Sequence, residues 1–236
     1  THDDLLFFTN RGKAYQIKMY DIPEAKRATR GKSIMNFLSL SGDEQVTSVL
    51  AIPKNLKEAN LSLVMVTKNG VAKKVDAASF RDVRRTGISA IKLSDDDMLL
   101  SVCPVSAGDS IILATRQGQS IRFAEKDLRQ MGRSAGGVRA IRLKKGDELI
   151  GANVVNKGIE ASLLVMTSAG FGKQTIIKEY KIQNRGGGGI KTVNLTKKTG
   201  ELIAARVVTE AVAEIVAISK QGQVIRTRLA EIPSLG

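Results

Sequence analysis

Apolar and polar positions follow a pattern that recurs about every fifty residues along the chain. Each copy opens with a continuous apolar run, such as Leu163–Met166, continues through Thr/Ser-x-x-Gly, and then alternates apolar with polar residues, as in Val224–Arg228. The turn glycines are Gly12, Gly70, Gly118, Gly170 and Gly222. Continuous apolar runs are typical of strands covered on both faces, and the glycine supplies the positive φ of a tight hairpin. Each copy is therefore predicted to begin with a β-hairpin.

The second half of each copy predicts two more strands. A second glycine follows 17 or 19 residues after the first, at Gly31, Gly87, Gly137 and Gly189. Apolar pairs four and six residues further on are interpreted as the third strand: Met35/Phe37, Ile91/Leu93, Ile141/Leu143 and Val193/Leu195. After an acidic turn, a final apolar run predicts the fourth strand at Val46–Ile52, Leu99–Val105, Leu149–Val155 and Leu202–Val208.

Four strands in every fifty residues are typical of blades that bury their faces against one another in a propeller-like fold. We predict one all-β domain over 1–236 with about five blades. The repeats span approximately 1–58, 59–107, 108–158, 159–210 and 211–236, and the last is expected to be truncated before its third strand. WD and kelch repeats fit poorly, because the chain has no tryptophan and lacks their glycine and aromatic signatures.

Charge is distributed unevenly within the repeat. The chain has 37 Lys and Arg against 23 Asp and Glu, a formal net charge of +14. Five segments, 11–32, 68–92, 116–142, 173–191 and 220–228, contain 29 of the basic residues and 7 of the acidic ones. They sum to +22 and the remainder to −8. Charged residues that served only to keep loops soluble would not place basic and acidic residues in different segments of the repeat. We therefore expect a polyanionic partner.

Duplex DNA is the expected partner. A basic element repeated on successive blades would form a curved positive surface, where bound DNA releases counterions. Bending 20–30 base pairs by 40–90° costs on the order of 1–6 kcal/mol, which several phosphate contacts can offset. We therefore expect binding and bending of duplex DNA without sequence preference. The predicted contacts are Arg27, Arg30, Lys32, Arg81, Arg84, Arg85, Arg122, Arg129, Arg133, Arg139, Lys173, Arg185, Lys191, Arg226 and Arg228.

Catalytic and metal-binding residues are not expected in this chain. The one histidine, His2, lies near the beginning of the sequence, and the one cysteine, Cys103, falls in an apolar run as a buried thiol would. The acidic triplet at 95–97 has counterparts in other repeats, which favours a turn over a Mg²⁺ site. The sequence predicts no cofactor, no membrane segment and no signal peptide, and indicates a cytoplasmic protein.

Several stretches resemble the C-terminal domain of the A subunit of bacterial DNA gyrase. They are Leu5–Tyr15, Asp21–Ala25, Thr29–Ile34, Gly170–Lys173 and Arg226–Arg228. The resemblance implies a β-pinwheel that wraps DNA around its rim and presents a transfer segment to an ATP-hydrolysing type IIA topoisomerase, which biases the enzyme toward negative supercoils. It also implies, as partners, the rest of the gyrase A subunit and the gyrase B subunit in the bacterial nucleoid.

The signature box of that family, Gln-Arg-Arg-Gly-Gly-Lys-Gly, has only a degenerate copy here. Gln183, Asn184, Arg185, Gly186, Gly187, Gly188 and Gly189 match it at five of seven positions. The family places the box in its first blade, which we expect this sequence to lack. We therefore expect the chain to bind and bend linear DNA while constraining little writhe in closed circles.

Two other interpretations of the repeat are less favoured. The related C-terminal domain of topoisomerase IV shares the fold and belongs to an enzyme that relaxes DNA, but the segments at 21–25 and 29–34 favour gyrase. A protein-interaction propeller would have no reason to separate +22 from −8. Single-stranded nucleic acid is disfavoured, because its binders stack bases on aromatic side chains and the basic segments hold few.

Overall fold

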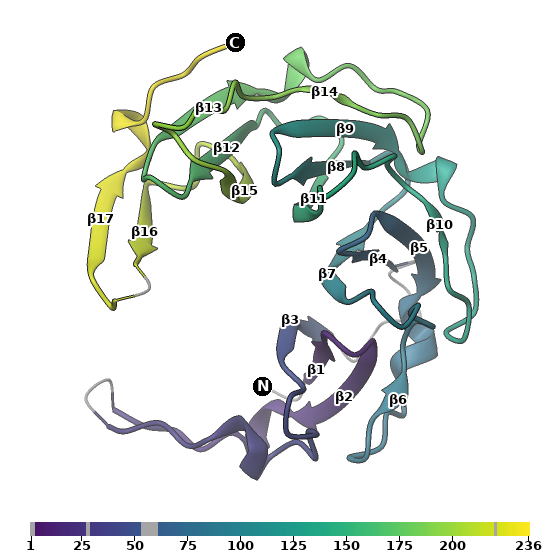
Figure 1. Ribbon diagram of the computed structural model, residues 1–236. Coiled ribbons are helices and arrows are strands. Elements are labelled where there is room, and N and C mark those ends of the chain that lie inside the picture. The colour runs from purple at the N-terminus through teal and green to yellow at the C-terminus, as the bar shows by residue number, and fades with distance from the viewer. Residues whose placement is uncertain (1–2, 27–28, 53–60, 220) are drawn as a thin grey trace. The chain divides into compact units, whose positions relative to one another are not determined.

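The computed structural model describes residues 3–26, 29–52, 61–219 and 221–236. They fall into two compact units, Thr1–Ala107 with Leu128–Ala140, and Gly108–Asp127 with Ile141–Gly236. Antiparallel strands and short 3-10 turns make up both units (Figure 1), which confirms the all-β prediction. Within the described residues, no helix is long and apolar enough to cross a membrane.

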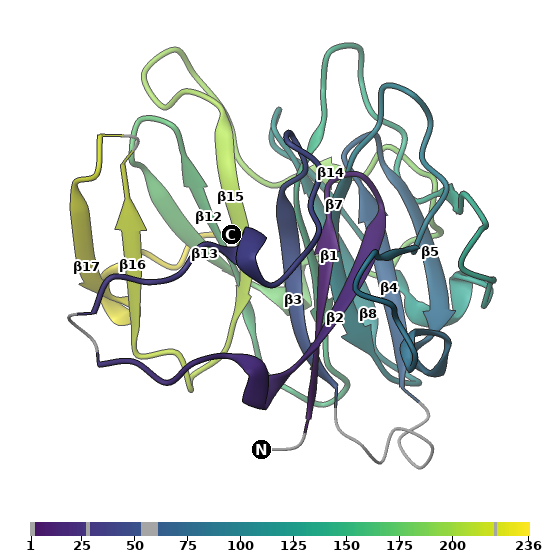
Figure 2. The same cartoon turned by 90° about the horizontal axis from the view of Figure 1, so that it is seen from below.

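The first unit contains two four-stranded sheets, ordered β3-β1-β2-β6 and β10-β5-β4-β7. Figure 2 shows β1, β2 and β3 running side by side. The strands are β1 (Asp4–Thr9), β2 (Lys13–Lys18), β3 (Val46–Ile52), β4 (Ser62–Thr67), β5 (Val71–Asp76), β6 (Ile88–Ser89), β7 (Leu99–Val105) and β10 (Val138–Arg139).

The second unit contains sheets ordered β11-β8-β9-β14, β13-β12-β15 and β16-β17. Its strands are β8 (Ser110–Thr115), β9 (Gln119–Ala124), β11 (Leu149–Val155), β12 (Ser162–Thr167), β13 (Gly172–Ile176), β14 (Ile190–Lys191), β15 (Leu202–Val208), β16 (Glu214–Ile218) and β17 (Val224–Arg228). The first strand of each hairpin is buried on both faces where a full sheet surrounds it, as the unbroken burial of β8 shows.

The third strand of each repeat differs from the prediction in its position. It has two residues, follows the second glycine directly, and joins the sheet of the preceding repeat. Thus β6 pairs with β2, β10 with β5, and β14 with β9. In the first repeat the predicted strand is instead a 3-10 turn, Ile34–Asn36, with Met35 exposed.

The apolar pairs that suggested third strands lie just beyond these short strands, where the ladder ends. The amides of Ala90 and Ile91 both donate to the carbonyl of Gly12, at 2.8 and 3.2 Å, so the chain turns inward. Ile91 then packs on Gly12, which has φ +71°, and a Cβ at Gly12 would lie 2.8 Å from the Ile91 carbonyl oxygen. The hairpin glycine therefore provides both a positive φ and room for the next repeat.

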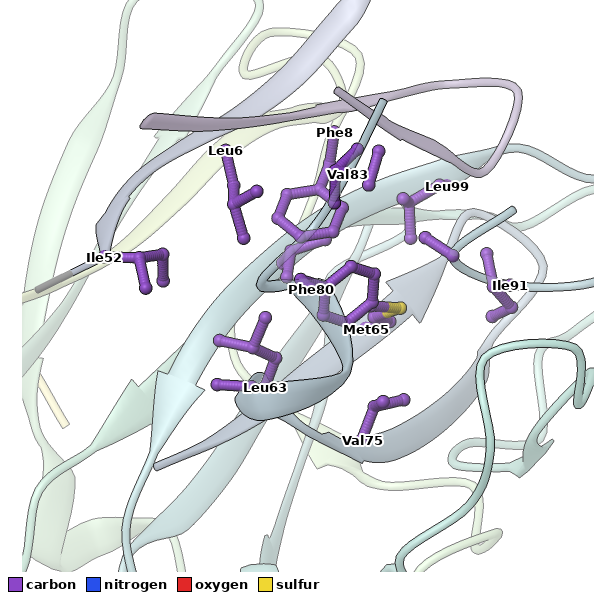
Figure 3. Close-up of a cluster of buried hydrophobic side chains, with 14 residues drawn as sticks. Leu6, Phe8, Ile52, Leu63, Met65, Val75, Phe80, Val83, Ile91 and Leu99 are labelled. Atoms are coloured by element: carbon purple, nitrogen blue, oxygen red, sulfur yellow. The ribbon is translucent and has the colours of Figure 1, made fainter. Parts of the chain in front are cut away.

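The core of the first unit joins its two sheets. Figure 3 shows Leu6 and Phe8 from β1 facing Leu63 and Met65 from β4, with Phe80 between them. The rings of Phe8 and Phe80 meet edge to face, with centroids 5.4 Å apart. Phe80 lies in the connection that leads onto the β2 edge, so the core ties this connection to both hairpins.

Replacing Phe80 with alanine should lower the free energy of unfolding by about 3–5 kcal/mol, because it removes a buried ring and leaves a cavity. Chemical denaturation monitored by circular dichroism measures the change. Ile218→Ala is the control, since this side chain is 70% exposed and its loss should change stability by less than about 0.5 kcal/mol. Equal losses in both variants would contradict the assigned core.

Candidate nucleic-acid interface

A connector is defined here as the segment between the second strand and the last strand of a repeat. The second, third and fourth connectors span 77–98, 125–148 and 177–201. Each begins with a 3-10 turn, at Ala77–Phe80, Glu125–Asp127 or Ile177–Glu179, and contains the short strand that joins the preceding sheet. The first connector includes Met19–Asp21, and the fifth begins with Leu229–Glu231.

One side chain in the middle of the second strand binds the connector that crosses it. In β9, the Arg122 guanidinium donates to the carbonyls of Ile177 and Tyr180, at 3.1 and 3.3 Å. Gln174 of β13, four residues after its hairpin glycine as Arg122 is, donates at 2.8 and 3.0 Å to the carbonyls of Leu229 and Ile232. These two side chains therefore hold equivalent points of consecutive connectors.

Arg122 was among the predicted DNA contacts, and the structure shows that it also has a structural role. The guanidinium also donates to Ser110 Oγ at 2.9 Å, and burial lowers its pKa. Its Nε and Nη1 groups thus donate to the protein itself, where they position the fourth connector.

Exposed cations gather on the connectors. Arg30 and Lys32 are exposed in the first connector, Arg84 and Arg85 in the second, Arg129 and Arg139 in the third, and Lys191 in the fourth. Arg81, Arg133 and Arg185 are partly buried in these same segments. Arg27 lies outside the described residues. Arg139 and Lys191 occupy equivalent places, as the second residue of β10 and of β14.

Two cations at the hairpin turns, by contrast, are paired with acidic side chains. Arg11 pairs with Asp43 and lowers its pKa, and Arg116 pairs with Glu148. Within the described residues Arg84, Arg85 and Arg129 make no ion pair, so their charge is available to a ligand.

The predicted contacts on the fifth hairpin belong to the paired group. Arg226 pairs with Glu214 on the neighbouring strand, and Arg228 Nε lies 3.5 Å from Glu231 Oε1. Both arginines are exposed, but any phosphate would compete with these carboxylates.

The acidic turns have a structural role. Asp97 Oδ1 accepts hydrogen bonds from the amides of Asn69 and Met98, at 2.9 and 2.8 Å. Asp147 makes the equivalent bonds to the amides of Gln117 and Glu148, at 3.0 and 2.9 Å. Each carboxylate thus ties the last strand to the hairpin of its own repeat. No group of residues that could hold a metal ion is found in the described part of the chain.

Consecutive connectors are joined directly, and two cations that were not among the predicted contacts lie at these junctions. The Lys92 amide donates to the carbonyl of Ala135 at 3.3 Å in the first unit. In the second unit the Arg142 amide donates to the carbonyl of Gly187 at 2.8 Å. Both side chains are exposed. Their signal in the sequence was a basic residue placed between the members of an apolar pair, Ile91/Leu93 or Ile141/Leu143.

The degenerate box forms the part of the fourth connector that crosses β9. The Gln183 amide donates to the carbonyl of Arg122 at 2.8 Å, and Arg185 Nε donates to the carbonyl of Asp127 at 2.9 Å. Asn184 and Gly188, which stand where the family box has basic residues, are exposed. Lys173, another predicted contact, is partly buried, with Nζ 3.3 Å from the carbonyl oxygen of Gly236.

Two glycines of the box make a matched test of this geometry. Gly189 has φ +73°, and a Cβ there would lie 2.4 Å from the Ser120 carbonyl oxygen, whereas a Cβ at Gly188 would meet no atom within 4 Å. Gly189→Ala should therefore lower the free energy of unfolding by about 1–3 kcal/mol, and Gly188→Ala should leave it nearly unchanged. Chemical denaturation measures both. Equal stability of the two variants would contradict the described loop.

The sequence model of a family described as "DNA gyrase C-terminal domain, beta-propeller" matches residues 3–53, 62–106, 109–156, 161–209 and 213–236. Each matched segment falls within one of the five predicted repeats. The DNA gyrase A subunit of Staphylococcus epidermidis is 36% identical over all 236 residues, and the same protein of Staphylococcus aureus is also 36% identical. The chain spans 26% of the length of these relatives.

Two solved structures share the fold. The C-terminal domain of DNA topoisomerase IV has a TM-score of 0.87 at 23% identity, over 100% of this chain and 74% of that one. The DNA gyrase A C-terminal domain has a TM-score of 0.81 at 26% identity, over 100% and 75%. The predicted fold class is therefore confirmed, since both structures match the whole of this chain and the matching family is described as a β-propeller.

Proposed function

The chain belongs to the family of DNA gyrase C-terminal domains, and on that premise we propose that it binds, bends and wraps duplex DNA along its connectors. In the parent enzyme this binding serves ATP-dependent negative supercoiling. The catalytic work belongs to the remainder of the gyrase A subunit and to the gyrase B subunit, which are the proposed protein partners. The proposed location is the nucleoid of a bacterial cytoplasm.

The placement of exposed cations is the observation that supports this proposal most. Connector cations such as Arg84 and Arg85 are exposed and make no ion pair among the described residues, whereas hairpin cations such as Arg11 and Arg116 are bound to acidic side chains. Main-chain hydrogen bonds join consecutive connectors within each unit, from the Lys92 amide in the first and from the Arg142 amide in the second. A row of such cations suits the regular spacing of phosphates along a duplex.

Contacts of this kind read no bases. The side chains are arginines and lysines on extended loops, and the described structure has no helix of a length that could enter a major groove. Phosphate contacts fix the position of the protein on DNA without selecting a sequence. The expected bias is therefore limited to DNA that bends at low energetic cost.

Gyrase is favoured over topoisomerase IV as the parent enzyme. The 36% identity to the gyrase A subunit covers the whole chain, whereas the likeness to the topoisomerase IV domain, at 23% identity, is one of fold. A gyrase A subunit in which this chain replaces the matching part of the native C-terminal domain, with the native box-bearing first blade retained, should allow the enzyme to introduce negative supercoils into relaxed plasmid. Relaxation without supercoiling would favour the topoisomerase IV assignment.

A paired substitution tests the proposed interface directly. The double variant Arg84→Ala, Arg85→Ala should bind a duplex of about 40 base pairs on the order of tenfold more weakly. The slope of log affinity against log salt should become less steep by about 2, because two phosphate contacts are lost. Fluorescence anisotropy at several salt concentrations gives both quantities.

The control removes the same net charge from ion-paired sites. Arg11 pairs with Asp43, and Arg116 pairs with Glu148. Arg11→Ala with Arg116→Ala should change affinity by less than about threefold. Equal losses from both pairs would show that net charge alone, and not the connectors, determines binding.

Restoring the basic residues of the family box should strengthen binding. Asn184 and Gly188 are exposed, and Gly188 has space for a side chain. The double variant Asn184→Arg, Gly188→Lys should therefore make the slope of log affinity against log salt steeper by about 2. The same salt series measures it, with Asn184→Gln and Gly188→Gln as the uncharged control. An equal gain in the control would rule out a phosphate contact at this loop.

A further inference from the structure

Lys73 is a buried cation at the centre of the second blade. It lies on β5 with an exposed fraction of 0%. Its Nζ donates to three carbonyl oxygens of the third connector, those of Gly132, Arg133 and Ala135, at 3.1, 2.6 and 3.0 Å. An ammonium group has three N–H donors, so each of them is satisfied by a main-chain oxygen.

The fold does not require a cation at this place. Three residues after the hairpin glycine, the first, third and fourth repeats have Tyr15, Ile121 and Lys173. Ile121 packs beneath the equivalent part of the fourth connector, with Cδ1 3.7 Å from the position of a Cβ on Gly187. An apolar side chain therefore supports a connector, and the three bonds of Lys73 need another explanation.

The connector bound by Lys73 contains Arg129, Arg133 and Arg139, which belong to the proposed interface. The described loop 128–140 and strand β4 carry no acidic side chain, so main-chain dipoles replace a counterion. On β5 itself the charged neighbours are Lys74 and Asp76. Burial, with a smaller contribution from Arg133, lowers the pKa of Lys73 to about 8. The group is thus mostly charged at pH 7 and mostly neutral at pH 9.

We infer that Lys73 is a positioning residue for DNA binding: by holding the carbonyls of residues 132–135 it fixes the part of the third connector that presents Arg133 to a phosphate. This inference rests on the proposed function. The neutral amine has two N–H donors for three carbonyl oxygens, so the loop loses one of its attachments when Lys73 is deprotonated. Lys73 itself, being buried, makes no contact with DNA.

Four proteins test the inference at pH 7: the wild type, Lys73→Met, Arg133→Ala and the double variant. Affinity for a duplex of about 40 base pairs is measured across a salt series. Lys73→Met should lose as much affinity as Arg133→Ala, on the order of three- to tenfold, with a salt slope flatter by about 1. The double variant should bind within about twofold of Arg133→Ala, because both changes remove the same contact. Ile121→Met, the equivalent apolar site on the next blade, should bind as the wild type does.

The pH dependence provides a measurement that needs no variant at Lys73. Wild-type affinity should fall between pH 7 and pH 9, by no more than the factor that separates the wild type from Lys73→Met at pH 7, because the neutral amine still donates two of the three hydrogen bonds. Arg133→Ala should show little change over this range, since the contact that Lys73 positions is already lost. This test stands even where Lys73→Met fails to fold.

The outcomes separate the two proposals. A wild type that does not bind duplex DNA would overturn the proposed function. A wild type that binds with the same affinity at pH 7 and pH 9, or losses from Lys73→Met and Arg133→Ala that multiply in the double variant, would overturn the positioning role alone.

Discussion

Hydrogen bonds between each connector and the sheet of the preceding repeat are the interaction on which the rest of this structure depends. The second strand of a buried hairpin has backbone N–H and C=O groups at its outer edge that find no partner within its own repeat. The short strands β6, β10 and β14 of the following repeats hydrogen-bond to these groups. The same crossing seats an apolar residue over the hairpin glycine, as Ile91 does on Gly12. Pairing and core packing therefore stabilise the connector together.

This architecture explains how positive charge can be concentrated without opposing charge. Main-chain hydrogen bonds and buried apolar residues hold a connector in place, so its polar side chains are not needed to stabilise it. Arg84, Arg85 and Arg129 are examples, since they make no ion pair in the described part of the chain. Acidic residues are used where they stabilise turns, as Asp97 and Asp147 are, and those turns lie outside the connectors' basic segments. The separation of +22 from −8 follows from this division of roles.

Much of the fold could be predicted from the sequence, because a β-hairpin has a sequence pattern that is contained in a few consecutive residues. The apolar run, the turn glycine and the alternating run placed β4 and β5, for example, and the positive φ of Gly70 is 83°. The exchange of the third strand could not be derived from the pattern, since Ile88–Ser89 is two residues long and its partner, β2, lies more than seventy residues earlier in the chain. The apolar pair beyond it gave the stronger signal and was misassigned as the strand.

The candidate site was predictable in outline and not in detail for a similar reason. Counting charge within repeats located the connectors, but it could not separate an arginine that faces solvent from one that binds a carbonyl. Arg122 and Arg84 look alike in the sequence, yet Arg122 holds Ile177 and Tyr180 while Arg84 is exposed. Lys73 likewise resembles a surface lysine of an alternating strand. Its burial depends on a connector from the next repeat, so only the tertiary structure identifies it.

The most direct test of the account is the salt dependence of affinity of the wild-type chain for two duplexes of about 40 base pairs with unrelated sequences. Cations displayed on successive connectors predict a plot of log affinity against log salt steeper than about −4, and affinities for the two duplexes within a few-fold of each other at every salt concentration. A slope near −1, or a preference for one sequence of more than about tenfold that persists at raised salt, would contradict it.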